Sequence, residues 1–509
     1  MSPLDAIGLQ VWSAALSAVA EEMQAALVRT AFSVTIKERR DCSTALFDAR
    51  GRMVAQSHSI PVHLGAMPEA VAAVMQRGAR PGEAWIINDP FRGGTHLPDI
   101  TIVSPVAVDG TVVAHAVTRA HHADVGGMSP GSMPAGAREL VQEGIVIPPM
   151  RIAGPDGLDQ PLLEMILANS RTPDERRGDL AAQLAAHRLA DERLAELAAR
   201  RGGPAAVQAA MDDILGYAER RTRAAIAAMP DGEWTAEEAL EGDGVTDADI
   251  VIRVRVVVEG DRLTVDFTGT DPAGPGNLNC PIAVTRSAVY FAVRVATDPD
   301  IGASAGAFAP VTIIAPEGSL VNAQPPSAVA AGNVEGSSRI TDAVLSALAG
   351  AAPVPAQGQG TMNNLTLGMG DRVYFETLAG GQGASPGADG PSAVHVTMSN
   401  TLNTPIEALE VAMPVLVERY AVRRGSGGAG AYRGGDGVIR RMRLLDDADV
   451  SLIAERRRSA PRGAEGGGDG EPGVTLVDDV PVPGKWRGRL PAGAVVEQRT
   501  PGGGGYGTP

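Results

Sequence analysis

The 509-residue sequence contains only two cysteines, Cys42 and Cys280. So few cysteines exclude a cysteine-rich zinc site and are typical of proteins that fold in a reducing compartment. We therefore expect a cytoplasmic protein. Since Cys42 follows an acidic residue at a candidate site, it could have a role there, but we interpret it as a packed side chain.

Lysine is almost absent, because only Lys37 and Lys485 occur and the other basic residues are arginines. No G-x-x-x-x-G-K-[ST] motif is present, which excludes a standard P-loop for ATP. The 44 basic and 60 acidic residues give a net charge of −16. An acidic chain without a basic patch is not expected to bind nucleic acid.

No run of eighteen or more apolar residues and no signal peptide can be found, so we expect no contact with a membrane. Aromatic residues make up only 3% of the chain. The hydrophobic cores must therefore be built from alanine, valine, leucine and isoleucine. A chain of this length is expected to form two or more structural units.

Histidine is also scarce, but six of the eight histidines lie between positions 58 and 122. A single histidine is more often a packed or surface residue than a ligand, yet this clustering favours a functional site. The densest stretch is Asn88 to Gly127, which reads NDPFRGGTHLPDITIVSPVAVDGTVVAHAVTRAHHADVGG. Asp109-Gly110 in its middle is a strong signal for a tight β-hairpin turn.

The hairpin brings three candidate ligands together. With a two-residue turn, position 99 pairs with position 120, and position 98 with position 121. His96, Asp99 and His121 then meet at the open end of the hairpin. Two imidazoles and a carboxylate are suited to Mn, Fe or Zn. His122 points the opposite way along an extended strand, so only one of the two adjacent histidines is expected to be a ligand.

The other histidines allow simpler interpretations. His58 and His63 lie in a loop, where they either line the pocket or bond the loop backbone. His115 is expected to pack inside a strand, and His187 to lie exposed on a helix. The segment Arg92, Gly93, Gly94 and Thr95 offers a guanidinium and backbone N–H groups that could hold an anion such as phosphate, although a plain Gly-Gly turn is equally consistent.

Periodicity predicts the elements around this site. Apolar residues repeat at three and four from Asp5 to Phe32, which predicts a helix with one buried stripe. Two further helices, from Thr172 to Arg201 and on to about Met229, form a helical hairpin with glycines between them. From Asp249 onwards the pattern is β-like. The loop GSGGAGAYRGGDGV lacks the strand–turn–helix context of a nucleotide fingerprint, which favours a flexible or close-packed structural loop.

The predicted fold class is α+β. We expect a mixed, multi-layer subunit with a metal site on a β-hairpin, a helical hairpin insert and a β-rich C-terminal half. The predicted divisions are residues 1–160 for the metal-site region, 161–235 for the helical hairpin, and 236–509 for the β-rich region with glycine-rich loops.

Several long motifs resemble the hydantoinase B/5-oxoprolinase family, which includes the corresponding subunit of acetone and acetophenone carboxylases. They are ERRDCSTALFD, QSHSIPVHLGAMPEAV, NDPFRGGTHLPDITIV, AHHADVGGMSPGSMP, NSRTPDERRGDLAAQLAA, VDFTGTDPAGPGNLNCP, GNVEGSSRITDAVLSALA, SNTLNTPIEALE, RRGSGGAGAYRGGDGV and TPGGGGYG. The resemblance implies that His96, Asp99 and His121 hold a divalent metal. It also implies Asp41 as a fourth ligand.

The resemblance further implies a hetero-oligomeric enzyme. A separate hydantoinase A-type subunit would bind ATP and Mg and phosphorylate a cyclic amide, such as a hydantoin or 5-oxoproline, and this chain would then hydrolyse the activated substrate at one divalent ion. Asp124 or His122 would be the general base or would support the ligands from outside. Two alternatives remain open, which are a subunit of an ATP-dependent ketone carboxylase and a non-catalytic partner that stabilises the ATP-binding subunit.

Overall fold

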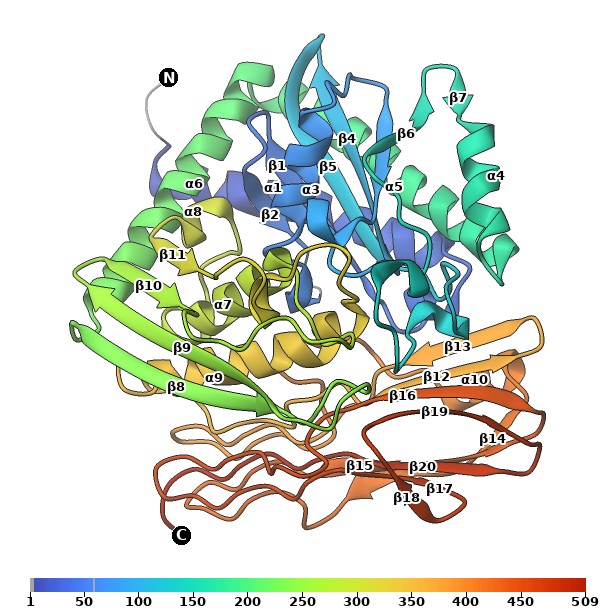
Figure 1. The fold of residues 1–509 in the computed structure, drawn as a ribbon. Coiled ribbons are helices and arrows are strands. Elements are labelled where there is room, and N and C mark those ends of the chain that lie inside the picture. Colours follow the sequence, from blue (N-terminus) through green and yellow to red (C-terminus); the bar gives the residue numbers. More distant parts are fainter. Residues whose placement is uncertain (1–3, 58–59) are drawn as a thin grey trace.

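A computed structural model describes residues 4–57 and 60–509 of the chain. These residues form four β-sheets, with helices packed on the first two sheets (Figure 1). His58 lies outside the described residues. The mixture of sheets and segregated helices confirms the predicted α+β class.

The first sheet has seven antiparallel strands in the order β2-β1-β5-β4-β3-β6-β7. Its strands are β1 (Cys42–Asp48), β2 (Met53–Gln56), β3 (Ala84–Ile87), β4 (Asp99–Val108), β5 (Thr111–His121), β6 (Met150–Gly154) and β7 (Gly157–Leu158). Side chains alternate between its two faces, so each face has a hydrophobic core of its own.

Three long helices cover one face of this sheet: α1 (Ala6–Thr30), α5 (Pro173–Arg201) and α6 (Pro204–Ala227). Asp5 caps α1 by accepting a hydrogen bond from the Gly8 amide at 2.7 Å. Gly202 ends α5 in the left-handed region, where φ is 97°. The predicted stripe on the first helix and the helical hairpin are both confirmed. Since both helices of the hairpin share a core with α1 and the sheet, they are integrated with this unit; the predicted division at residues 160 and 235 stays a prediction.

His187 corrects one expectation, because it is buried and not exposed. It lies on the side of α5 that faces the sheet, and its ring nitrogens bond Ser104 Oγ at 2.6 Å and Thr118 Oγ1 at 3.0 Å. The amphipathic pattern of α5 is weak, so the sequence did not show which side is buried. Shorter helical elements complete this region: α2 (Val34–Lys37), η1 (Pro61–His63), α3 (Met67–Met75), η2 (Pro90–Arg92), η3 (Pro130–Ser132), η4 (Leu140–Gln142) and α4 (Gln160–Ala168).

The second sheet has four strands in the order β11-β10-β9-β8. Its strands are β8 (Gly232–Leu240), β9 (Ile250–Glu259), β10 (Arg262–Asp266) and β11 (Val311–Ile314). Helices α7 (Ile282–Ala296) and α9 (Ser337–Leu348) pack against it and share its core. The β-pattern was expected only from Asp249, so β8 was missed. Glutamates occupy much of this strand and mask its alternation. Three short elements belong to the same unit: α8 (Ala305–Phe308), η5 (Leu320–Asn322) and the π-helix η6 (Gly332–Gly336).

The remaining two sheets form a sandwich with one apolar core between them. Their orders are β13-β12-β16-β19 and β14-β15-β20-β17-β18. The elements are β12 (Asn364–Met369), β13 (Arg372–Glu376), α10 (Ile406–Ala412), β14 (Val415–Arg423), β15 (Gly437–Leu444), β16 (Ala448–Ile453), β17 (Val474–Val477), β18 (Val480–Val482), β19 (Lys485–Leu490) and β20 (Val495–Arg499). The β-rich C-terminal half is thereby confirmed.

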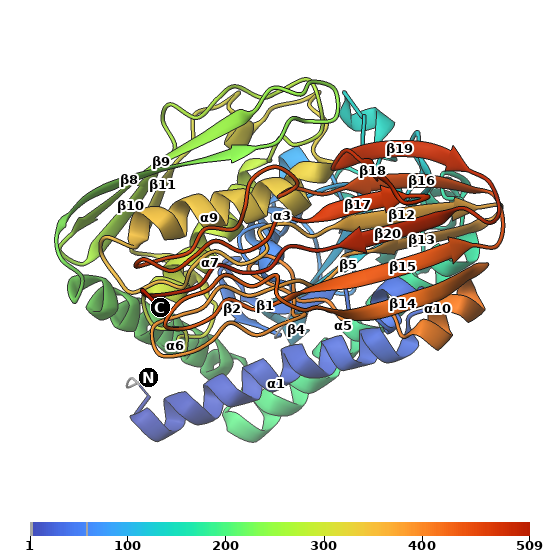
Figure 2. The ribbon, with the colours of Figure 1, turned by 90° about the horizontal axis from the view of Figure 1, so that it is seen from below.

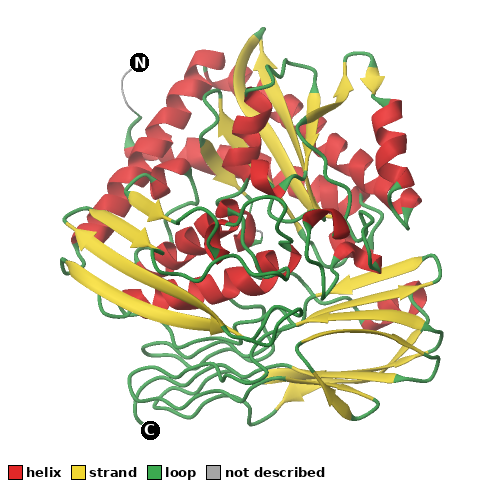
Figure 3. Ribbon diagram, viewed as in Figure 1, coloured by secondary structure: helices red, strands yellow, loops and turns green. Residues whose placement is uncertain are grey.

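Glycine-rich segments extend from one end of the sandwich as a bundle of irregular chains (Figures 2 and 3). Backbone hydrogen bonds hold them side by side: the Gly428 amide donates to the Gly503 carbonyl at 2.9 Å, and the Gly503 amide to Gly435 at 2.9 Å. A Cβ at Gly434 would collide with the Gly503 carbonyl oxygen. The predicted structural loop is therefore a close-packed one.

Candidate metal centre

The β4–β5 hairpin positions the central residues. Asp109 and Gly110 both have positive φ, 49° and 76°, as a tight hairpin turn requires. Next to the turn Val108 pairs with Thr111, as predicted. A β-bulge at Val106–Ala107 then shifts the register by one residue, so Asp99 pairs with His121. The expected pairing of position 99 with position 120 is wrong, and the shift brings the two candidate ligands directly opposite each other.

Both residues lie on the sheet face away from α1, α5 and α6. One ligand atom from each of His96, Asp99 and His121 lies within 4.8 Å of the others. Asp99 Oδ1 is 3.1 Å from His96 Nε2 and 3.3 Å from His121 Nδ1. A divalent ion with bonds of about 2.1 Å would separate neighbouring ligand atoms by roughly 3.0–3.4 Å. These two distances are compatible with a metal ligand set.

The second carboxylate oxygen of Asp99 is held from the other side. Thr95 Oγ1 donates to Asp99 Oδ2 at 2.5 Å, and His63 Nε2 donates to the same oxygen at 3.2 Å. His63 Nδ1 in turn accepts a hydrogen bond from Ser43 Oγ at 2.7 Å. Burial opposes ionisation of Asp99, but His96 and His63 outweigh it and hold the pKa of the carboxyl well below its usual range. The site therefore contains an ionised carboxylate with a fixed orientation.

The ring of His121 is fixed by stacking. Phe375 from β13 lies parallel to it, with centroids 4.5 Å apart and an interplanar angle of 15°. The Arg39 guanidinium is 5.1 Å from the Phe375 ring centroid, and it donates to the Phe375 carbonyl at 2.8 Å. Burial lowers the pKa of His121, which favours the neutral imidazole that binds a metal.

Buried ring nitrogens without hydrogen-bond partners indicate whether the cluster fits an ion. Among the described residues, both ring nitrogens of His96 and Nε2 of His121 are buried and have no hydrogen-bond partner. Buried polar atoms without a partner are costly unless an ion or water satisfies them. The cavity at the cluster measures about 20 Å³, which accommodates an ion or one water. The donor set and this space fit one divalent ion.

Asp41, the expected fourth ligand, lines the same small cavity. Its carboxylate is 3.6 Å from the buried guanidinium of Arg39, and its carbonyl accepts a hydrogen bond from the His121 amide at 3.0 Å. Asp41 is not one of the three residues whose ligand atoms converge, so its role as a ligand stays a prediction.

His122 and Asp124 lie outside the cluster. His122 points to the opposite sheet face, where Nε2 bonds Gln183 Oε1 of α5 at 3.0 Å. Burial lowers the pKa of His122 to about 4. Asp124 accepts hydrogen bonds from the amides of Gly126, Gly131 and Arg171 and from the Arg171 guanidinium. A catalytic role for His122 or Asp124 stays a prediction. The contacts of Asp124 indicate that its carboxylate stabilises the loop that follows β5.

The segment Arg92 to Thr95 is divided between two environments. The Arg92 side chain is mostly exposed and lies 3.5 Å from Asp89. Gly93 has a φ of 103°, and a Cβ there would collide with the backbone of Glu69 and Ala70. Gly94 packs against the Asn88 carbonyl, while Thr95 bonds Asp99. Anion binding by this segment stays a prediction.

Other residues of the small cavity come from distant parts of the chain. They are Ile60, Val62, Asn333, Val334, Met362, Phe375, Thr377, Ser399 and Thr401. Reasoning from the hairpin alone did not find them, because local spacing carries no information on long-range packing. Several lie in or beside the quoted family motifs, in particular GNVEGSSR and SNTLN, and that resemblance was the one signal available for them.

Comparisons with known proteins show the family of the chain. The family model described as hydantoinase B/oxoprolinase matches residues 5–509. An uncharacterized protein of Methanocaldococcus jannaschii is 37% identical, with 99% of this chain and 91% of that protein covered. The 5-oxoprolinase of Dictyostelium discoideum is 35% identical over 99% of this chain, which spans 40% of that enzyme.

Two solved structures share the fold. The ATP-dependent caprolactamase from Pseudomonas jessenii has a TM-score of 0.90 and 29% identity, with 99% of this chain and 91% of that chain covered. An acetone carboxylase structure has a TM-score of 0.87, covers 98% of this chain and 75% of that chain, and is 18% identical, which shows a likeness in fold alone. Among the described residues, no helix is both long and apolar enough to cross a membrane.

Proposed function

We propose that this chain, which belongs to the hydantoinase B/oxoprolinase family, is the metal-bearing part of an ATP-dependent cyclic amidohydrolase. The observation that carries the proposal is the convergence of His96, Asp99 and His121 on one buried point. A divalent ion bound there would supply Lewis acidity, which polarises a carbonyl or phosphoryl oxygen and acidifies water. Asp41 is proposed to complete the ligand set.

The protein groups around the ion have separate tasks. Thr95 and His63 orient Asp99, so that one oxygen is free to face His96 and His121. Phe375 keeps the His121 ring in one plane. The buried walls keep bulk water away, which strengthens electrostatic interactions at the reacting centre. A preorganised site of this kind supports hydrolysis of a substrate that is already activated.

Activation is proposed to come from another polypeptide segment. The chain spans only 40% of the D. discoideum 5-oxoprolinase, and its sequence contains no P-loop motif. An amide carbonyl is a poor electrophile, whereas phosphorylation of its oxygen creates a good leaving group. We therefore propose a hydantoinase A-type subunit that binds ATP and Mg and phosphorylates the cyclic amide, in a cytoplasmic hetero-oligomer.

Co-purification with the protein encoded beside this chain tests the proposal. The complex is assayed for ADP and product with hydantoins, 5-oxoproline, other lactams, and ketones with bicarbonate. We expect a cyclic amide to give equal amounts of ADP and ring-opened product, and this chain alone to give neither. ATP-dependent formation of a carboxylated ketone without lactam opening would contradict the proposal and identify a carboxylase.

A further inference from the structure

A second, much larger cavity lies beside the metal pocket. It has a volume of about 920 Å³, within the range of roughly 300–1,000 Å³ that small-molecule sites occupy. Its walls come from α1, β2, η1, α6, α7 and the segment after α7, and Asn400. We call it the large cavity. The metal pocket, at about 20 Å³, is too small to hold an organic substrate.

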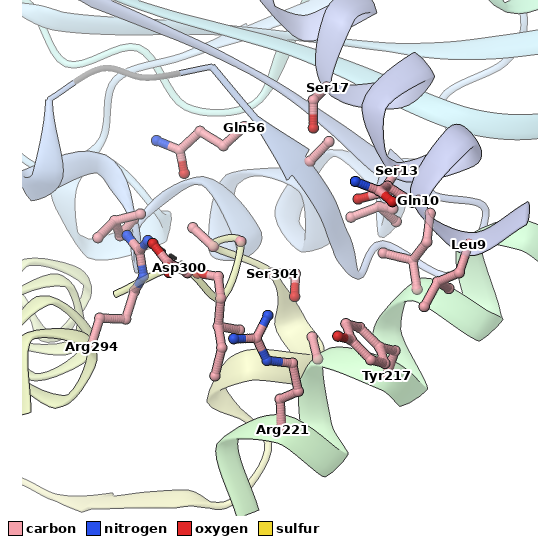
Figure 4. A pocket seen from close by; sticks show the side chains of 18 of the residues that line it. Leu9, Gln10, Ser13, Ser17, Gln56, Tyr217, Arg221, Arg294, Asp300 and Ser304 are labelled. Atoms are coloured by element: carbon pink, nitrogen blue, oxygen red, sulfur yellow. Dashed lines mark hydrogen bonds between the residues drawn. The ribbon is translucent and has the colours of Figure 1, made fainter. Parts of the chain in front are cut away.

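The lining combines apolar and polar side chains (Figure 4). Leu9, Val54, Ile214 and Phe291 provide apolar surface. The polar side chains are Gln10, Ser13, Ser17, Gln56, Tyr217 and Ser304. This composition is that of a ligand site, in which apolar walls bury the molecule and a few polar groups orient it.

The charged lining residues are mostly basic, although the whole chain carries a net charge of −16. They are Arg220, Arg221 and Arg294, together with one aspartate, Asp300. Arg221 is paired with Asp298 through one terminal nitrogen, and its guanidinium lies 5.8 Å from the centroid of the Tyr217 ring. Figure 4 shows Arg221 and Arg294 on the same side of the cavity.

Arg294 is held in place by backbone carbonyls. One terminal nitrogen donates to the carbonyls of Pro299 and Ile301, each at 3.0 Å. Its Nε is buried and has no hydrogen-bond partner among the described residues. A guanidinium that is fixed by its neighbours and keeps free donors is suited to a carboxylate or phosphate oxygen.

The large cavity and the metal pocket share two walls. In the first wall, Ile60, Val62 and His63 line the metal pocket, while Pro61 and Leu64 line the large cavity. In the second wall, Ser399 and Thr401 line the metal pocket and Asn400 lines the large cavity. Neighbouring residues of each segment thus line different cavities, which places the two spaces close together.

We propose that the large cavity binds a small molecule bearing a carboxylate or a phosphate, with Arg221 and Arg294 recognising the anion, and that it is the substrate site beside the metal pocket. The assignment of this cavity as the substrate site rests on the proposed function. A substrate phosphorylated by a partner subunit is anionic, so an arginine-lined cavity next to the metal provides the complementary charge.

Binding is measured by calorimetry on the full chain after removal of metal by chelation, so that the result is independent of the metal site. The probes are inorganic phosphate, 5-oxoproline, and 2-pyrrolidone as a neutral lactam. We expect at least one anion to bind about tenfold or more tightly than 2-pyrrolidone, because ionic hydrogen bonds are strong in a partly buried site. The comparison of phosphate with 5-oxoproline identifies the preferred anion.

Two substitutions assign the binding to the cavity. Arg221→Gln and Arg294→Gln should each weaken anion binding about tenfold. Arg223→Gln is the matched control, since this neighbouring arginine of α6 pairs with Glu219 and Asp261 and does not line the cavity. Circular dichroism checks that the variants are folded. If the wild type binds no anion, if 2-pyrrolidone binds equally well, or if folded Arg221→Gln binds like the wild type, the proposal is wrong.

The assignment of the large cavity as the substrate site is tested separately in the reconstituted complex. Arg221→Gln should raise the KM for the cyclic amide while the metal content stays that of the wild type. An unchanged KM, together with lost anion binding, would show that the cavity serves another anion and is not the substrate site. If metal removal leaves turnover unchanged but the anion still binds, the proposed function fails and the cavity assignment stands.

Discussion

At Asp99 the two carboxylate oxygens have different environments. Oδ2 accepts hydrogen bonds from Thr95 and His63, and Oδ1 faces the two candidate histidine ligands. Groups that orient a ligand from outside in this way commonly contribute about tenfold to a hundredfold to metal affinity. His63 therefore belongs to the site, although the sequence left its role open between the pocket and the loop backbone.

Thr95→Val should lower metal affinity by about tenfold, because it removes one donor to Asp99 and preserves the side-chain shape. Competition with a chromophoric chelator measures the change. Thr118→Val is the control, since that buried hydroxyl bonds His187 on the opposite sheet face. Equal metal affinity in Thr95→Val and the wild type would show that Asp99 needs no such support.

Two histidines outside the metal ligand set, the buried His187 and the half-buried His395, predict a pH dependence of stability. Burial lowers the pKa of His187 and that of His395 to about 3, from a usual value of 6.5. Between these pH values the unfolded chain binds protons that the folded chain excludes. The free energy of unfolding should therefore decrease as the pH falls from 6.5 toward 3, by up to about 1.4 kcal/mol per pH unit for each histidine.

His187→Gln removes one of these two contributions. Urea unfolding at a series of pH values should give a shallower decrease for this variant than for the wild type. If both proteins lose stability with the same slope, His187 is not excluded from protonation in the folded state.

At the scale of elements, the hairpin shows what the sequence could and could not predict. Asp109-Gly110 located the turn, and alternation located β4 and β5. The bulge at Val106–Ala107 carried no signal, because valine and alanine fit a regular strand as well as a bulged one. The three converging ligands were nevertheless identified, since a shift of one residue keeps them at the same end of the hairpin.

Contacts between distant elements account for most of what was missed. Phe375 stacks on His121 across more than 250 positions of sequence, and Asn333 reaches the pocket from a π-helix. The buried side of α5 was not evident either, because alanines and arginines occur around its whole circumference. Such packing follows from the tertiary fold and leaves no local periodicity.

The glycine-rich bundle is expected to tolerate no side chain at its closest contacts. Gly434→Ala should destabilise the protein by about 1–3 kcal/mol, since its Cβ would meet the Gly503 carbonyl and force the backbones apart. Thermal or urea unfolding measures the change. Gly136→Ala is the control, because the nearest atom to its Cβ is the Arg487 Nε at 3.9 Å. Equal stability of the two variants would mean that the glycine-rich bundle accommodates the added methyl group with no loss of unfolding free energy.

At the scale of the whole molecule, the metal pocket lies where three units meet. The first sheet supplies the ligands, the second unit supplies Asn333, and the sandwich supplies Phe375. Buried ion pairs join the second unit to the sandwich: Arg456 contacts Asp342 of α9 at 2.7 Å, and Arg339 of α9 contacts Glu455 at 3.6 Å. Removing one partner of a buried pair is strongly destabilising, so these contacts constrain how the units fit together.

This arrangement separates activation from completion of the reaction. If a partner subunit phosphorylates the substrate and this chain hydrolyses it, damage to the metal cluster should affect product formation more than ATP use. Asp99→Asn preserves the size of the side chain and removes the charge that faces His96 and His121. It should weaken metal binding with little effect on folding.

The most direct test measures ADP and ring-opened product in the same reaction of the reconstituted complex. With Asp99→Asn we expect substrate-stimulated ADP formation to continue while product falls about tenfold to a hundredfold, together with lower metal content by elemental analysis. The wild-type complex should give ADP and product in equal amounts. An Asp99→Asn complex that makes product at the wild-type rate, with ADP and product still equal, would contradict the account and place the chemistry elsewhere.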